Sequence, residues 1–163
     1  MTGDQIPRPT IEGGLWADDL TPGQSFTSRS HSLTLADVVG FATEFDPQPF
    51  HLDEQRAAGT FFDRVVASGW HTSAITMRLL VETVPLATGL IGARCESSWP
   101  TASLPGDVLH VEVVVDEVRW SKSRPGRASL VLACRTVNEA GAVRQEMQTR
   151  LIAWARPPQG VGV

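Results

Sequence analysis

The stretch Phe41-Ala-Thr-Glu-Phe-Asp46-Pro-Gln-Pro-Phe-His51-Leu-Asp-Glu-Gln-Arg-Ala57 holds a carboxylate and an imidazole five residues apart, with two prolines between them. Proline fixes φ, lacks an N–H donor and disfavours a helical conformation in the residue before it. A helix that arrives from the N-terminal side therefore ends near Asp46, and we expect a rigid, extended elbow to follow. Such an elbow can direct Asp46 and His51 at one water molecule, as general acid–base chemistry requires.

Gly69 lies eighteen residues after His51, in the segment Val65-Val-Ala-Ser-Gly-Trp-His-Thr72, directly before a long apolar run. A glycine where a helix begins lets a ligand oxygen approach unpaired backbone N–H groups at the positive end of the helix dipole. Acid, imidazole and backbone donor together form a candidate catalytic set. The alternative for the first segment alone is a helix-ending turn with an incidental histidine.

These residues resemble the MaoC-like dehydratases and (R)-specific enoyl-CoA hydratases. The signature of that family runs from an aromatic residue through Gly-Asp-x-Asn-Pro-hydrophobic-His to a small residue, and later to His-Gly-Met before the central helix. The positions in register with it are Asp46, Pro49, Phe50, His51 and Ala57, and Gly69 takes the place of the second glycine. The resemblance covers roughly residues 20–156.

The chain departs from that signature at three places. Phe45 replaces the glycine before the acid, Gln48 replaces the asparagine, and the residues 67–70 replace those around His-Gly-Met. Because the acid, the imidazole and the glycine remain, we expect the first and third departures to affect substrate choice more than chemistry.

Length and composition set the protein class. The 163 residues suffice for one domain with a substantial core. With 42% apolar residues, 20% charged residues and a net charge of −4, the chain lacks the overall basic field that nucleic-acid binding requires. It contains no apolar run of about eighteen residues and no basic-then-apolar leader, so we expect a cytoplasmic protein that spans no membrane. Cys95 and Cys134 lack metal-ligand spacing and are predicted to be buried free thiols.

The apolar periodicity predicts an N-terminal helical part. Residues 1–24 are rich in Gly, Pro and Asp and are expected to form an arm, followed by a first strand over 24–33. The segment Thr34-Leu-Ala-Asp37 resembles a capping box with Asp in place of Glu, and it opens the helix that ends near Asp46. A short helix is expected over 53–59. The run 70–84 predicts a helix that is apolar on nearly every face and therefore buried.

From Gly89 onward the apolar period changes to two, which predicts strands over 90–99, 107–120, 127–138 and 142–154, with a hairpin turn at 138–141. Strands joined by hairpins form an antiparallel sheet. We therefore predict an α+β protein with a single hotdog domain over 25–156, in which a five-stranded sheet wraps around a long buried helix, as the family resemblance also implies. Residues 157–163 are predicted to be a disordered tail.

The resemblance implies hydration of a 2-enoyl thioester, or the reverse dehydration of a 3-hydroxyacyl thioester. Asp46 and His51 would hold and activate the water, and the Gly69 N–H would stabilise the enolate oxygen. Coenzyme A or an acyl carrier would enter only as part of the substrate, with no metal or redox cofactor, and a homodimer is implied. The alternatives are a hotdog acyl-CoA thioesterase and a catalytically idle subunit that binds acyl thioesters.

Five further residues belong to the candidate substrate site. Ser68 contacts substrate or water, or else packs at the start of the helix. Trp70 and Phe50 line an acyl pocket or the core. The turn 120–127 carries three cations, and we expect Lys122 and Arg124 to contact the phosphates of coenzyme A at the tunnel mouth, the alternative being a solvated hairpin tip.

Overall fold

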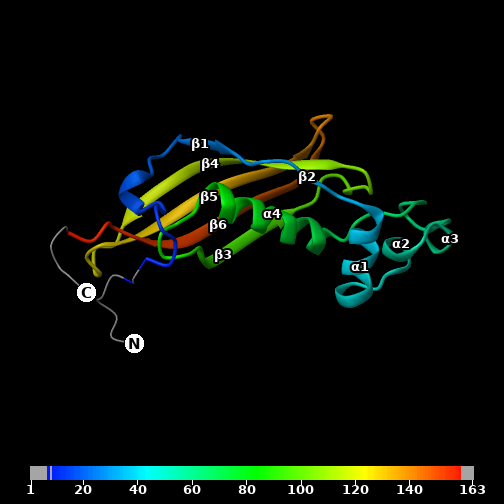
Figure 1. Cartoon of the computed structure of the whole chain (residues 1–163), viewed down its shortest axis with the longest axis horizontal. Helices are drawn as coiled ribbons and strands as arrows, with labels where there is room; N and C mark the ends of the chain where they lie inside the picture. Colours follow the sequence, from blue (N-terminus) through cyan, green and yellow to red (C-terminus); the bar gives the residue numbers. More distant parts are fainter. Residues whose placement is uncertain (1–6, 8, 159–163) are drawn as a thin grey trace.

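The computed structural model describes residue 7 and residues 9–158 of the chain. One antiparallel sheet carries the long helix α4 along one of its faces, and the shorter helices α1, α2 and α3 gather at one end of the sheet (Figure 1). The elements in chain order are η1 (Ala17–Asp19), β1 (Ser25–Thr27), β2 (His31–Ser32), α1 (Leu35–Phe45), α2 (Pro49–Leu52), α3 (Glu54–Ala57), α4 (Gly69–Thr83), β3 (Ile91–Ser98), β4 (Val108–Trp120), β5 (Arg127–Asn138) and β6 (Val143–Trp154).

The sheet order is β1-β4-β5-β6-β3, and β2 also pairs with β4. The predicted hotdog architecture is confirmed, with six strands instead of five because the strand expected over 24–33 is split in two. Ser28 explains the split: its N–H donates to the Val111 carbonyl, and its hydroxyl, in place of a backbone carbonyl, accepts from the Val111 N–H. The four long strands lie within one residue of their predicted bounds.

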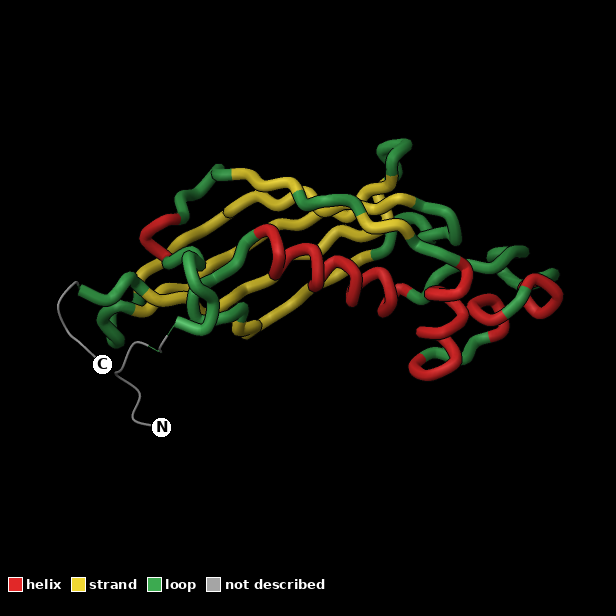
Figure 2. Tube along the Cα trace, viewed as in Figure 1, coloured by secondary structure: helices red, strands yellow, loops and turns green. Residues whose placement is uncertain are grey.

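The helix α4 packs against the sheet through one face only (Figure 2). Ile75, Leu79 and Leu80 are buried in the core cluster that also contains the inward residues of β4, β5 and β6. The sequence predicted that this apolar helix is buried. In a single chain that prediction is wrong for its outer side, because Trp70 is 66% exposed and Met77 is 40% exposed. An apolar surface along a helix is a surface that a second molecule can cover.

The edge strand β3 is exposed along nearly its whole length. Cys95 lies in it and is therefore exposed, so its predicted burial is wrong, whereas Cys134 in the central strand β5 is buried and free. Burial raises the pKa of the Cys134 thiol to about 12. The N-terminal part of the described chain also adds to the core, through the buried residues Trp16, Ala17 and Leu20. Most of the tail predicted over 157–163 lies outside the described residues.

Candidate active site

Asp46 stands where α1 ends. The predicted capping box opens this helix, since the Asp37 N–H donates to the Thr34 hydroxyl and the Thr34 N–H donates to the Asp37 carboxylate. Asp46 is the C-cap, and its N–H still donates to the Ala42 carbonyl at 3.0 Å. The extended elbow is shorter than predicted, because Pro49 already occupies the first turn of α2, a position that proline tolerates.

His51 lies in α2 and is 5% exposed. Its Nδ1 is 2.7 Å from the Val66 carbonyl oxygen. Because a carbonyl only accepts, Nδ1 carries a proton and donates it to Val66, and Nε2 is the ring nitrogen that faces Asp46. That Nε2 is 3.4 Å from Oδ2 of Asp46. The carboxylate and this ring nitrogen are close enough to contact the same water molecule.

The Asp46 carboxylate is partly buried and well supplied with donors. Its Oδ1 accepts from the Gln48 amide at 2.8 Å. Burial opposes ionisation, but hydrogen bonds from Ser68 and Gln48 and the proximity of His51 outweigh it, so the pKa of Asp46 lies below its usual value. Asp46 is therefore a carboxylate at neutral pH, as a proton acceptor must be.

Ser68 and Gly69 open α4 beside this pair. Ser68 is the N-cap, since its hydroxyl accepts from the Trp70 N–H at 3.1 Å, and its side chain lies close enough to Asp46 to lower the pKa of that carboxyl. Within the described part of the chain, the Gly69 N–H has no protein acceptor. A Cβ at position 69 would lie 2.9 Å from Cε2 of Trp99, so only glycine fits under that ring.

These groups converge on a pocket of about 360 Å³. Asp46, Gln48, His51 and Gly69 line one side of it. Aromatic rings form its apolar wall: Phe50, Phe62, Trp70 and Trp99. The remaining lining residues are Ala67, Thr72, Thr101, Ala102, Ser103 and Arg144. The volume suits the acyl end of a small substrate.

Two aromatic groups shape the pocket. The rings of Trp70 and Trp99 meet edge to face with centroids 5.6 Å apart. Phe50 packs edge-on against both His51 and Phe62, with centroid distances of 4.6 and 5.1 Å. Phe50 and Trp70, which were predicted to line an acyl pocket or the core, both line this pocket.

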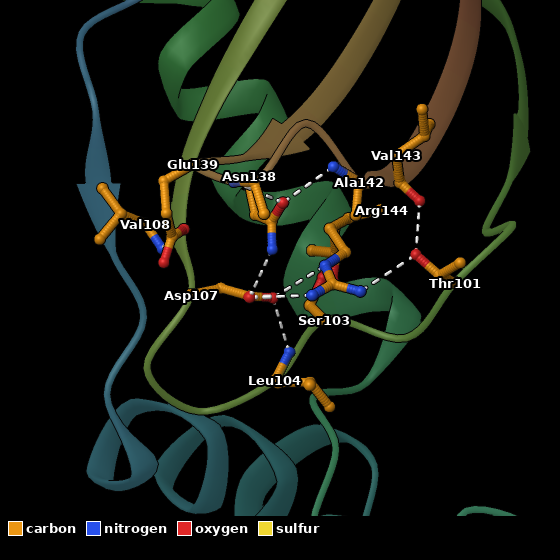
Figure 3. A network of polar contacts seen from close by, with 12 residues as sticks. Thr101, Ser103, Leu104, Asp107, Val108, Asn138, Glu139, Ala142, Val143 and Arg144 are labelled. Carbon is orange, nitrogen blue, oxygen red and sulfur yellow. Dashed lines mark hydrogen bonds and ion pairs between the residues drawn. The ribbon is translucent and has the colours of Figure 1, made fainter.

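Arg144 is a pocket residue that the sequence did not suggest. Figure 3 shows it joined to Asp107 and Thr101, with Asn138 and Leu104 also donating to Asp107. Its Nη2 is 2.9 Å from Oδ1 of Asp107, and its Nη1 is 3.1 Å from the Thr101 hydroxyl. Nε lies 2.9 Å from Oδ2 without meeting hydrogen-bond geometry, so we count this contact as an ion pair only.

The structure does not bring Lys122 and Arg124 to the pocket of their own chain. They lie in the turn that follows β4. The strand β4 begins directly after Asp107, the partner of the pocket residue Arg144, and its 13 residues span about 40 Å at about 3.3 Å per residue. Figure 1 shows this turn at the opposite end of the sheet from α1 and α2. There they line a second, cationic pocket of about 540 Å³ together with Arg119, Arg127 and Arg150.

No group of three or more His, Cys, Asp or Glu side chains in the part of the chain that the structure describes is placed to bind a metal ion. His71 points away from the pocket, stacked on Phe41 with centroids 4.6 Å apart. Among the described helices, none has the length and apolar character needed to cross a bilayer.

Comparison with known proteins agrees with this geometry. A sequence model of the family described as "MaoC like domain" matches residues 19–132, which includes the whole segment from Asp46 to Gly69. The chain belongs to the MaoC-like domain family. A crystal structure of a MaoC-like dehydratase from Rhodospirillum rubrum is 49% identical, with a TM-score of 0.86 over 88% of this chain and 99% of that one.

Two further relatives extend the comparison of this MaoC-like domain. The R-hydratase PhaJ1 from Pseudomonas aeruginosa, in its unliganded form, is 25% identical with a TM-score of 0.71, over 91% of this chain and 97% of that chain. The uncharacterized protein YdeM of Bacillus subtilis (strain 168) is 42% identical over 65 residues, which make up 40% of this chain and 46% of that protein. The aligned region thus spans about half the length of this curated relative.

Proposed function

We propose that this MaoC-like protein catalyses the reversible hydration of a 2-enoyl thioester to a 3-hydroxyacyl thioester. The observation that carries the proposal is the Asp46–His51 pair, in which Nε2 faces Oδ2 at 3.4 Å beside the free Gly69 N–H. All three groups line one pocket. The family supports a hydratase or dehydratase activity in general, since the similar structures include a dehydratase and an (R)-hydratase by description.

The chemistry needs three contributions. Asp46 and His51 hold one water, whose oxygen adds to C3 of the enoyl group while its proton passes to the pair. A proton returns from the pair to C2, so that water adds across the double bond without any change of oxidation state. Negative charge forms on the thioester oxygen between these steps, and the Gly69 N–H stabilises it. Loss of such a donor costs about 3 to 4 kcal/mol in other enzymes.

The hydration requires no redox or metal chemistry, because proton transfer and one oxyanion donor suffice. We therefore propose that coenzyme A or an acyl carrier takes part only as the substrate's carrier. The pair works on one face of the double bond, which favours syn addition, and the likeness to an R-hydratase supports an (R)-3-hydroxyacyl product.

A thioester hydrolysis assay run in parallel separates this function from its alternatives. Purified protein is mixed with crotonyl-CoA, and loss of the conjugated enoyl absorbance is followed together with release of free thiol. We expect the absorbance to fall to an equilibrium value without thiol release. Thiol release would indicate a thioesterase, and no change of either signal would indicate an idle acyl-binding subunit. Phe45, which replaces the glycine before the acid, does not line the pocket and is 65% exposed, so it leaves the pocket of its own chain open.

We propose that the protein acts as a homodimer. The strand β3 has eight residues and pairs with β6 on one side only, and exposed edges of this length are normally covered. Exposed apolar side chains lie beside it and along α4: Ile91, Trp99, Trp70 and Met77. A sedimentation experiment at micromolar concentration should give twice the chain mass of 17.6 kDa. A monomer under those conditions would contradict the proposal.

A further inference from the structure

A β-bulge directs Arg144 into the catalytic pocket. In the β5–β6 pairing, Val143 faces Val137 and Gln145 faces Thr136, which leaves Arg144 as the extra residue. Arg144 and Gln145 are consequently both buried, although strict alternation along a strand would send one of them to the opposite face. Bulges occur next to active sites, where they redirect a side chain. Arg144 is 8% exposed and lines the same pocket as Asp46 and His51.

One edge of the Arg144 guanidinium is already occupied. Asp107 takes the edge formed by Nε and Nη2, and Nη1 donates one proton to the Thr101 hydroxyl. Asp107 is in turn held by Asn138 and the Leu104 N–H. A guanidinium has five N–H donors. By count, one N–H on each Nη remains without a partner among the described residues, and donors on Nη1 and Nη2 are the pair that binds a carboxylate as a fork.

The residues around Arg144 form a polar floor beneath the aromatic wall. Thr72 and Ser103 share a hydrogen bond of 2.8 Å, and the Thr101 hydroxyl donates to the Val143 carbonyl. All of these side chains line the pocket. These hydroxyls are already paired within the protein, so the Arg144 N–H groups are the donors that a long aliphatic chain would leave desolvated and unpaired, at a cost in free energy. The pocket of about 360 Å³ also limits the acyl group to a few carbons.

We infer that the preferred substrate is a short 2-enoyl thioester whose acyl chain ends in a carboxylate, and that Arg144 binds this carboxylate. The inference rests on the proposed hydration for the reaction, but it concerns recognition. Asp107 keeps the guanidinium oriented before substrate arrives, so little side-chain entropy is lost on binding. The carboxylate then satisfies the two remaining donors in a site that excludes water.

The test compares acyl thioesters of equal chain length on the wild-type protein. The pairs are fumaryl-CoA with crotonyl-CoA, and glutaconyl-CoA with 2-pentenoyl-CoA. We expect kcat/KM to be at least about tenfold higher for the carboxylated member of one or both pairs, the discrimination expected when buried donors lose their acceptor. Equal or faster hydration of the uncharged member in both pairs would overturn the inference.

A binding measurement separates this inference from the proposed reaction. Glutaryl-CoA and pentanoyl-CoA lack the double bond, so their dissociation constants measured by calorimetry report recognition alone. If no enoyl thioester is hydrated, the proposed function fails, and a Kd ratio of about ten or more in favour of glutaryl-CoA still upholds the role of Arg144. A ratio near one refutes that role whether or not the protein is a hydratase.

Substitution of Arg144 assigns the preference to this residue. Arg144→Lys retains the charge but loses the fork, and should reduce the glutaryl-CoA preference at least fivefold while the Kd of pentanoyl-CoA stays unchanged. Arg135→Lys, an exposed arginine paired with Glu112, is the matched control and should change neither value. If Arg144→Lys does not fold, Asp107→Asn combined with Arg144→Gln removes both charges and should abolish the preference. A preference that persists in a folded variant overturns the assignment.

Discussion

The indole ring of Trp99 lies directly over Gly69, so closely that a Cβ at position 69 would come within 2.9 Å of Cε2 and 3.0 Å of Cδ2. Both residues line the catalytic pocket, and Gly69 carries the N–H that has no acceptor in the described chain. The glycine therefore serves two purposes at once: it leaves accessible the N–H that we propose as the oxyanion donor, and it allows Trp99 to form the pocket wall.

Replacing Gly69 with alanine should displace the Trp99 ring. We expect Gly69→Ala to lower kcat/KM at least about tenfold, because both the wall and the access to the N–H change. Gly40→Ala is the matched control, since a Cβ there meets nothing within 4 Å and alanine favours the helix α1. The double variant Gly69→Ala with Trp99→Ala should recover part of the loss in steady-state kinetics. Additive losses would argue against the steric explanation.

The Asp46–His51 pair should be indispensable for turnover. Asp46→Asn and His51→Ala are each expected to lower kcat at least about a hundredfold, the lower bound for general acid–base groups. The double variant should be little worse than either single one, because residues that act as a unit are strongly non-additive. Asp53→Asn, at the exposed N-cap of α3, tests the same chemical change away from the pocket. Near-normal turnover in Asp46→Asn would remove the carboxylate from the mechanism.

Ser68 should control the ionisation of Asp46. Its hydroxyl stabilises the carboxylate form, so Ser68→Ala should raise the pKa of Asp46 towards or above the ordinary value. Carboxyl carbon chemical shifts, followed by NMR as a function of pH, measure this change directly. Ser121→Ala, in the distant turn, provides the control. An unchanged Asp46 titration would show that burial, Gln48 and His51 determine it without Ser68.

Asp107 should make stability depend on acid pH. Burial opposes its ionisation, but hydrogen bonds from Arg144, Leu104 and Asn138 hold the pKa of Asp107 below its usual value. Its contribution to the free energy of unfolding is thus fully present above the unfolded-state pKa of about 3.9. This contribution is lost as the pH falls through the lower pKa that Asp107 has in the folded state. At pH 7, Asp107→Asn should cost about 3 to 5 kcal/mol by leaving Arg144 unpaired. Denaturant titrations should show this difference shrinking below about pH 3.9.

The cationic turn should matter for coenzyme A only through a second subunit. Because Lys122 and Arg124 lie far from the pocket of their own chain, they can contact the phosphates only of a substrate that is bound to the partner subunit. Reversing both charges to Glu should then raise KM for acyl-CoA several-fold, more so at low salt, with kcat unchanged. A pantetheine thioester without the nucleotide is the control substrate. Equal KM values for both substrates in the variant would identify a solvated turn.

The features predicted correctly from the sequence are those that depend on nearby residues. The capping box of Thr34 and Asp37, the end of α1 at Asp46 and the long alternating strands follow from spacing within a few residues. Arg144 and Trp99 could not be assigned to the pocket in this way. Arg144 reaches it through a register shift between β5 and β6, and Trp99 packs on a glycine thirty residues away in the sequence. Such contacts depend on the tertiary structure, for which local periodicity carries no signal.

The pairing of Trp70 with Trp99 at the pocket also gives the protein an intrinsic optical probe. The chain contains five tryptophans and no tyrosine, so tyrosine contributes nothing to its fluorescence. Indole groups dominate its near-ultraviolet spectrum. Two indoles whose centroids are 5.6 Å apart are close enough to couple electronically. Ligand entry that moves either ring should change the emission and the circular dichroism of the unlabelled protein.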